Sequence, residues 1–432
     1  SRRRHTRYWR DWSSDVCSSD LKIMIHQNRR KELLSQLDDN CVIIISTNPE
    51  QFRNGDVTFP FRPHSDFFYL TGFHEPEAVA IISKNSYSMF LRPKDKTREI
   101  WDGARLGLAD APNTLKLGHA FDINQLETQL EKLIPSESSV YFDEKPCKLD
   151  SQIANILSKH NPISFQESLH EMRLIKGASE IEIMQKAADI SSAAHTLAMA
   201  QVSPGMFEYE LQSVFDAHFV KNNTQHAYTP IVAGGKNACV LHYIKNNKPL
   251  KSGDLVLIDA GCELNYYASD ITRTFPVSGQ FSEPQKQIYQ IVLNAQLAAI
   301  DAIKPGIDVH KPHQIASGII QQGLKKIGLL MPGEPLAKFY MHGTGHWLGM
   351  DVHDVGKYQN NQQHRVFEKG MVITVEPGIY IRKDDKIDPI YHHIGIRIED
   401  DVVVTETGNT VLTRNLIKTI NDIETLMSQA NL

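Results

Sequence analysis

The sequence of 432 residues lacks the features that mark membrane, disulfide-rich and nucleic-acid-binding proteins. Its longest apolar runs, such as residues 41–45, are far shorter than the roughly 20 residues that cross a bilayer. Five cysteines form no zinc-ribbon or redox-pair spacing, so we expect free thiols in a reducing cytoplasm. The net charge of −5 gives no indication of a nucleic-acid partner.

Residues 1–23 differ in composition from the rest of the chain. The first ten residues contain five arginines, and the segment carries a net charge of +3 although the whole chain carries −5. It has no apolar stretch of the kind found in secretory signals, and its three aspartates argue against a transit peptide. We therefore expect a non-native or disordered leader, with the natural start at Met24.

The remaining sequence is long enough for two domains, because single cores stop growing at about 250–300 residues. Hydrophobic residues make up 41% and charged residues 22%, which is typical of a globular protein. Residues 24–172 alternate strand-like and helical stretches and predict an α/β domain. The strand-like stretches are 42–46, 67–70, 78–82, 89–91 and 140–142, and the helical ones are 126–133 and 153–157.

Residues 177–425 predict a second domain in which one unit occurs twice. The first copy has a helix over 181–200 with a capping box that starts at Ser179, a Pro-Gly break, an amphipathic helix and β-rich sequence. The second copy repeats this order with helices over 283–303 and 308–327. This repetition indicates a pseudo-symmetric domain.

The first copy contains two acids at the ends of strand-like runs, Asp259 and Asp270. A hairpin with its tip at residues 264–265 would bring these side chains opposite each other, with Cβ atoms about 4.5–5.5 Å apart. Two metal ions in a shared site lie about 3.5–4 Å apart, so both carboxylates would reach them. For either acid alone, a solvated position in a hairpin is the better explanation.

The second copy contains a similar pair, Glu376 and Glu399. A hairpin centred near residues 387–388 would bring them together, and coincidence becomes a poor explanation once both pairs are counted. Four carboxylates carry a charge of −4, which two divalent cations would neutralise. Without cations, the mutual repulsion of the carboxylates raises their pKa values. Such a site favours manganese, calcium or magnesium, and one imidazole would add a preference for a transition metal.

Histidines are concentrated among glycines in residues 342–353. The glycines disfavour a helix, and the segment lacks the His-Glu-x-x-His pattern of zinc proteases. For any one of these histidines, a hydrogen-bonded structural role explains the sequence as well as metal binding does. The candidates are His342, His346 and His353, with His242 as a fourth and weaker one.

Taken together, these motifs resemble those of the pita-bread metallopeptidases, and within that family they are most similar to the bacterial Xaa-Pro aminopeptidases (aminopeptidase P). The matching segments are 257–261 (Leu-Ile-Asp-Ala-Gly), 270–275 (Asp-Ile-Thr-Arg-Thr-Phe), 342–353, 375–378 (Val-Glu-Pro-Gly) and 395–400 (Gly-Ile-Arg-Ile-Glu-Asp), with 65–73 and 99–101 nearer the N-terminus. The resemblance extends from about Met24 onward. It implies an α/β N-terminal domain followed by an α+β pita-bread (creatinase/aminopeptidase-like) catalytic domain with pseudo-two-fold symmetry.

The resemblance implies a dinuclear-metal aminopeptidase that hydrolyses the N-terminal Xaa-Pro bond of peptides with a metal-bridging water or hydroxide. The implied ligands of two divalent ions, usually manganese in this family, are Asp259, Asp270, His346, Glu376 and Glu399. Asp270 and Glu399 would bridge the ions, and Glu376 would also act as general base.

Further roles follow from the same resemblance. His353 and His242 would stabilise the tetrahedral intermediate and assist proton transfer, and His342 would line the proline pocket. Arg397 would support an acidic ligand, with Tyr380 also at the site. Trp347 or Tyr340 could form part of an apolar wall for the proline ring, although a core position explains either residue equally well. The family forms homo-oligomers, here a dimer or tetramer, in which the N-terminal domain closes a neighbour's active site. Trp101 and Asp56 match positions at that contact.

Alternatives within the family remain open. Prolidase cleaves Xaa-Pro dipeptides with the same metal centre but must recognise a free carboxylate, and methionine aminopeptidase needs no N-terminal domain of this size. A catalytically inactive binding scaffold, or the metal-free creatinase branch, is disfavoured because all five ligands are present. The sequence departs from its closest relatives at residues 343–345, Gly-Thr-Gly, where these often have Gly-Leu-Ser.

Overall fold

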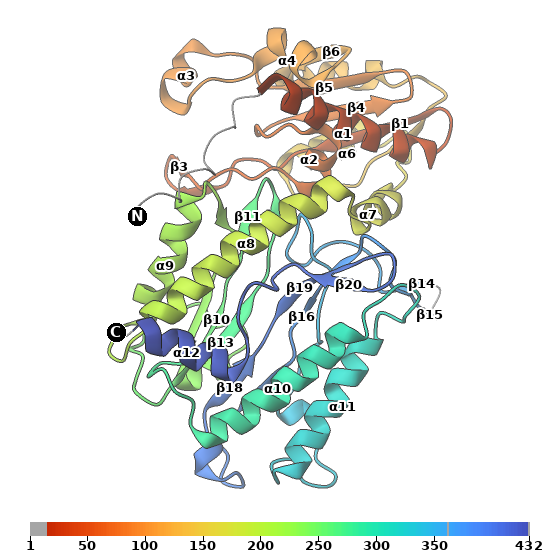
Figure 1. The fold of residues 1–432 in the computed structure, drawn as a ribbon. Helices are drawn as coiled ribbons and strands as arrows, with labels where there is room; N and C mark the ends of the chain where they lie inside the picture. The colour runs from red at the N-terminus through yellow and green to blue at the C-terminus, as the bar shows by residue number, and fades with distance from the viewer. Residues whose placement is uncertain (1–14, 361–362, 431–432) are drawn as a thin grey trace, which may run out of the picture. The chain divides into compact units, whose positions relative to one another are not determined.

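The computed structural model describes residues 15–360 and 363–430, which divide into two compact units, Ser1–His170 and Glu171–Leu432 (Figure 1). Most of the expected leader lies outside the described residues, although helix α1 (Asp15–Ser35) begins within it. Its non-native origin therefore stays a prediction. Among the described helices, none is long and apolar enough to cross a membrane.

A mixed five-stranded sheet with the order β6-β5-β4-β1-β7 forms the centre of the first unit. Strand β1 is antiparallel to β4 and parallel to β7, and all of its residues are buried, as expected for an inner strand. The strands are β1 (Cys41–Ser46), β4 (Val79–Ser83), β5 (Tyr87–Leu91), β6 (His119–Asp122) and β7 (Ser139–Tyr141), with β2 (Phe52–Asn54) and β3 (Val57–Thr58) as a separate hairpin. The further helices are α2 (Ser65–Thr71), α3 (Lys96–Asp102), α4 (Gly107–Leu115), α5 (Leu126–Gln129), α6 (Lys148–Leu157) and α7 (Gln166–Leu174).

The strand predicted for residues 67–70 is wrong, because these residues lie in helix α2. Six of its seven residues are buried, so the apolar run carries neither the alternation of a strand nor the single face of a surface helix. The helix ends at Gly72, which adopts the left-handed conformation at φ 68° and donates its N–H to the Phe68 carbonyl. The helix predicted over 126–133 is also interrupted, since α5 is flanked by 3₁₀ turns.

The second unit repeats two helices followed by strands, as the sequence predicts. The first copy contains α8 (Ala178–Gln201), α9 (Glu208–Lys221), β8 (Gln225–His226), β9 (Ile231–Gly234), β10 (Leu255–Asp259), β11 (Cys262–Leu264), β12 (Tyr267–Ala268) and β13 (Thr272–Pro276). The second contains α10 (Glu283–Asp301), α11 (Lys311–Lys326), β14 (Gln359–Asn360), β15 (Gln363–His364), β16 (Val372–Val375), β17 (Gly378–Ile381), β18 (Ile394–Arg397), β19 (Asp400–Val404), β20 (Asn409–Val411) and the final helix α12 (Ile420–Ala430).

The strands of this unit are covered by its long helices (Figure 1). Helices α8 and α9 pack on the strands of the first copy, whereas α10 packs on β16, β17 and β18. One apolar core joins both copies, with Ile258 from the first and Ile373 from the second. The predicted capping box is displaced, because α8 begins at Ala178 and Glu180 accepts the Gly177 N–H at 3.0 Å. The strand ends that carry the candidate acids are thus held by a shared core.

Candidate metal centre

The first acid pair lies on a hairpin whose register differs from the predicted one. The tip falls at Asn265 and Tyr266, which both adopt left-handed conformations, at φ 50° and 66°. Because the tip lies one residue further along the chain, Asp259 pairs with Thr272 and not with Asp270. Asp270 instead faces Gly261, where an added Cβ would lie 1.8 Å from the Ser269 carbonyl oxygen. The two acids are therefore diagonal neighbours across a backbone contact that requires glycine.

The second acid pair has the predicted register. The pairs Val375–Asp400 and Gly378–Arg397 flank the two glutamates in one continuous antiparallel alignment. This alignment places Glu376 opposite Glu399. The hairpin centre expected near residues 387–388 is therefore correct.

Residues 344–348 of the histidine segment run antiparallel along β16. The Thr374 N–H donates to the His346 carbonyl at 3.0 Å, and Trp347 forms a bridge with Ile373. The contact is tight, because a Cβ added at Gly345 would lie 1.9 Å from the Thr374 carbonyl oxygen. The His346 Nδ1 atom lies 3.1 Å from its Trp347 carbonyl partner, which directs the other ring nitrogen toward the acids.

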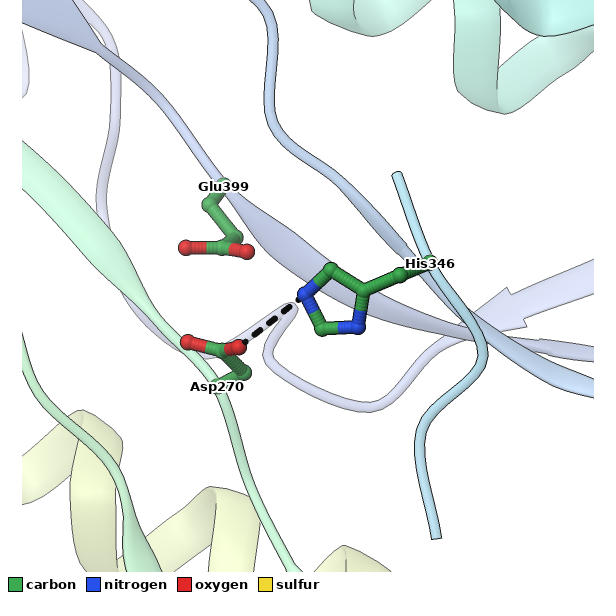
Figure 2. Close-up of side chains that lie close together, drawn as sticks. All are labelled: Asp270, His346 and Glu399. Carbon is green, nitrogen blue, oxygen red and sulfur yellow. Dashed lines mark ion pairs between the residues drawn. The ribbon is translucent and has the colours of Figure 1, made fainter. Parts of the chain in front are cut away.

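Asp270, His346 and Glu399 converge, with one potential ligand atom of each within 4.8 Å of the others (Figure 2). The His346 Nε2 atom lies 3.4 Å from Asp270 Oδ2 and 3.8 Å from Glu376 Oε1. Asp259 joins this group through Tyr228, whose hydroxyl lies 2.6 Å from both Asp259 Oδ1 and Asp270 Oδ1. The structure thus brings all five predicted ligand residues to one place.

Arg397 and Thr272 donate hydrogen bonds that fix the orientation of two of the acids. The Arg397 guanidinium donates to Asp259 Oδ2 at 2.5 Å, to the Tyr380 hydroxyl at 3.0 Å and to Thr272 Oγ1 at 3.0 Å. Thr272 in turn donates its hydroxyl to Glu399 Oε2 at 2.6 Å. Sequence reasoning anticipated Arg397 and Tyr380 but missed Thr272 and Tyr228. Thr272 lies inside a quoted motif, whereas Tyr228 carries no local signal.

Burial and mutual repulsion make full ionisation of the acids unfavourable. Burial raises the pKa of Glu376 to about 7, and burial together with Asp270 and Glu376 raises the pKa of Glu399 well above its usual value. Burial likewise raises the pKa of Asp259, although Arg397 opposes this. Despite its burial, His346 has its pKa raised to about 9, mainly by its contact with Asp270.

One cavity of about 610 Å³ is lined by the four acids, His346, Tyr228 and Arg397. His242, His342 and His353 line it as well, and His353 packs on His346 with ring centroids 4.1 Å apart. The His342 Nε2 atom lies 2.9 Å from the Tyr380 hydroxyl oxygen. An apolar wall completes the cavity, formed by Ile231, Leu241, Ile244 and Val352.

Several candidates lie elsewhere. Trp101 and Asp56 are exposed on the first unit and do not line this cavity. Their expected contact with a neighbouring subunit stays a prediction. Trp347 is a buried core residue that stacks on Tyr358 and does not line this cavity. Tyr340 is also buried and lines a neighbouring cavity. Neither aromatic ring therefore lines the cavity that contains the acids.

The residues present fit a pair of divalent cations. Four carboxylates and one imidazole form the donor set preferred by hard to borderline metals. Among the described basic groups, Arg397 forms an ion pair with Asp259, and the His346 ring lies 3.4 Å from Asp270 and 3.8 Å from Glu376. Burial raises the pKa values of Glu376 and Glu399, and the neighbouring carboxylates add to this; bound cations would offset both effects.

Comparisons with known proteins agree with this geometry. The model of metallopeptidase family M24 matches residues 182–406, and that of the aminopeptidase P N-terminal domain matches residues 26–141. Xaa-Pro aminopeptidase from Haemophilus influenzae is 43% identical over 416 residues, which cover 93% of this chain and 96% of that protein. Xaa-Pro aminopeptidase from Escherichia coli is 40% identical over 95% of this chain and 99% of that protein.

The solved structure of Pseudomonas aeruginosa aminopeptidase PepP superimposes with a TM-score of 0.90 at 41% identity, covering 95% of this chain and 98% of that one. The predicted fold class, an α/β N-terminal domain with a pita-bread catalytic domain, is thereby confirmed. The chain belongs to metallopeptidase family M24, in its aminopeptidase P (Xaa-Pro aminopeptidase) branch.

Proposed function

We propose that this chain removes the N-terminal residue from peptides whose second residue is proline, with two divalent cations, manganese in particular, as cofactors. The observation that carries the proposal is the convergence of four carboxylates and His346 in one cavity of about 610 Å³. This convergence occurs in a chain 43% identical to a relative named Xaa-Pro aminopeptidase.

Five residues would hold the cations. Asp270 and Glu399 would be shared by both ions, Asp259 would belong to one of them, and His346 with Glu376 to the other. When bound, such ions supply a bridging water that ionises near neutral pH and polarise the scissile carbonyl. Carboxylate-rich sites favour manganese over copper or zinc, which supports manganese as the cation.

The protein's own groups would move and hold protons. Glu376 lines the cavity, where its carboxylate would accept a proton as general base. His353 and His242 border the same cavity, where each ring can donate a hydrogen bond to developing negative charge. The pKa of His353 is lowered by burial and then by His346, so it stays neutral at pH 7.

Selection of proline would come from the cavity wall. An Xaa-Pro amide has no N–H, so its site needs apolar contact for the ring and no acceptor for a backbone donor. His342, held by the Tyr380 hydroxyl, faces the same cavity as Ile231 and Leu241. We propose that these side chains enclose the ring.

Three further properties stay predictions. We expect a homo-oligomer, a dimer or tetramer, in which Trp101 and Asp56 contribute to a neighbour's active site. We also expect the two predicted domains, 24–172 and 177–425, to correspond to a closing domain and a catalytic domain. Peptide turnover in the cytoplasm is the expected setting.

The decisive experiment measures release of the first amino acid from an Xaa-Pro-Zaa tripeptide. Protein stripped with a chelator is assayed with and without manganese, beside the matching Xaa-Pro dipeptide and an Xaa-Ala-Zaa control. We expect manganese-dependent cleavage of the Xaa-Pro tripeptide alone. Cleavage of the dipeptide alone would indicate a prolidase, and no cleavage by folded, metal-loaded protein would indicate a binding scaffold.

A further inference from the structure

Thr344 lies between His342 and His346, and its backbone is bound to the strand that leads into Glu376. The Glu376 N–H donates to the Thr344 carbonyl at 2.7 Å. The next residue, Gly345, packs against Thr374 with no room for a side chain. The position of the Glu376 backbone is therefore fixed by its contact with the backbone of residues 344–346.

The side chain of Thr344 is only 4% exposed and lines a second cavity of about 560 Å³, not the metal cavity. Its hydroxyl oxygen lies 2.6 Å from the Tyr340 hydroxyl oxygen and 2.9 Å from His313 Nδ1. Tyr340 is 4% exposed, and His313 belongs to helix α11. The hydroxyl thus ties the histidine segment to a helix outside the metal centre.

This arrangement satisfies every polar group involved. A hydroxyl donates one hydrogen bond and accepts two, so Thr344 can serve both neighbours at once. Burial lowers the pKa of His313, which keeps its ring neutral with one donor and one acceptor nitrogen. Tyr340 also packs edge-on against His342, with ring centroids 5.0 Å apart. Thr344 is therefore linked through its carbonyl to Glu376 and through Tyr340 to the His342 ring.

We propose that Thr344 is a positioning residue, whose hydroxyl, held between Tyr340 and His313, fixes the backbone that orients Glu376. It touches neither cations nor peptide and acts through the Thr344 carbonyl and the Glu376 N–H. The inference rests on the proposed function for the identity of the reaction. A ligand misplaced by about 1 Å can lower turnover by up to about a hundredfold, so a small shift is measurable.

The test compares Thr344→Val, which keeps the shape and removes the hydroxyl, with Thr344→Ser, which keeps it. We expect kcat for the Xaa-Pro tripeptide to fall about tenfold in T344V, with KM within about threefold and two metal equivalents retained. T344S should stay within about twofold of wild type. The matched control is Thr224→Val, because Thr224 is also buried and donates its hydroxyl to the Phe219 carbonyl. It should lose stability but keep its kcat.

A second readout does not depend on activity. The visible absorption of the cobalt-substituted protein reports the ligand geometry, and it should change in T344V but not in T344S or T224V. Wild-type inactivity would refute the proposed function alone, since the cobalt comparison would still stand. If T344V fails to fold, Tyr340→Phe removes the other side of the same contact and should lower kcat in the same direction. A T344V protein with wild-type kcat and a wild-type cobalt spectrum would overturn the inference. The same result in Y340F would do so where T344V does not fold. An equal effect in T224V would also overturn it.

Discussion

Replacing Tyr228 tests whether its hydroxyl orients two acids of the candidate metal centre. Its hydroxyl oxygen lies 2.6 Å from a carboxylate oxygen of Asp259 and 2.6 Å from one of Asp270. Burial, followed by the two acids, raises the pKa of Tyr228 well above its usual value, so the group stays protonated. One hydrogen is therefore shared between two carboxylates. Replacing Tyr228 with Phe removes this hydrogen and little volume.

The magnitude follows from one charge-assisted hydrogen bond. Such a bond contributes about 1.5–3 kcal/mol, which corresponds to roughly a 10- to 150-fold change in an equilibrium constant. Substituting a group that orients a metal ligand typically costs about 10- to 100-fold in affinity, so two independent estimates agree. We expect Tyr228→Phe to raise the manganese concentration for half-maximal activity by about 10- to 100-fold. Turnover at saturating manganese should stay within about threefold.

The assay titrates manganese into chelator-stripped protein and follows both heat of binding and peptide hydrolysis. Tyr267→Phe is the matched control, because the Tyr267 hydroxyl donates to Glu180 Oε1 at 2.6 Å. That contact is the same in kind but involves no candidate ligand. Equal manganese affinity in wild type and Tyr228→Phe would refute the reasoning. An equal loss in Tyr267→Phe would show that the effect is general destabilisation.

Three other predictions concern the same centre. Asp270→Ala and Glu399→Ala should each abolish peptide hydrolysis and lower bound metal, measured by elemental analysis; full activity in Asp270→Ala would rule out the two-metal proposal. His353→Ala should lower kcat about 100-fold with unchanged metal content, and a parallel loss of metal would contradict a role in proton transfer. In chelator-treated protein the pKa of Glu376 is about 7, above the value of 4.5 for an unperturbed glutamate. The folded state then holds the extra proton, so wild type should lose stability relative to Glu376→Gln as pH rises from about 4.5 to 7. Urea unfolding at a series of pH values measures this difference, and a constant difference would refute the shift.

The two hairpins show what the sequence can and cannot specify. The register of the second hairpin is predictable because its strands are long apolar runs on both sides of an acid. The register of the first depends on its turn, where Tyr266 adopts φ 66°. A tyrosine rarely adopts this conformation, so Leu264-Asn265 is the expected tip. One misplaced turn residue moves the partner of Asp259 from Thr272 to Asp270.

The proposed metal ligands were predictable because each borders an apolar run or lies among glycines. Tyr228 was not predictable, because it lies in the loop between β8 and β9, 31 residues before Asp259, and meets that acid only in the folded chain. For Trp347, beside His346, the sequence left two interpretations open, a pocket wall or a core residue. Its 0% exposure and its stacking on Tyr358 give it a role in packing.

The neighbouring acids Glu399 and Asp400 show how the fold separates a proposed metal ligand from a structural carboxylate. Asp400 is buried but paired with Arg273 at 2.7 Å and Lys418 at 2.5 Å, and these cations, against the effect of burial, lower its pKa to about 2. Glu399 is equally buried, and among the described residues its carboxylate accepts a hydrogen bond only from the Thr272 hydroxyl. Burial, followed by Asp270 and Glu376, raises its pKa well above the usual value. A buried carboxylate left without a protein cation is costly unless it is protonated or binds a metal. Alternation along one extended segment thus directs one side chain to basic groups and the next to the cavity, which is why a single motif supplies both.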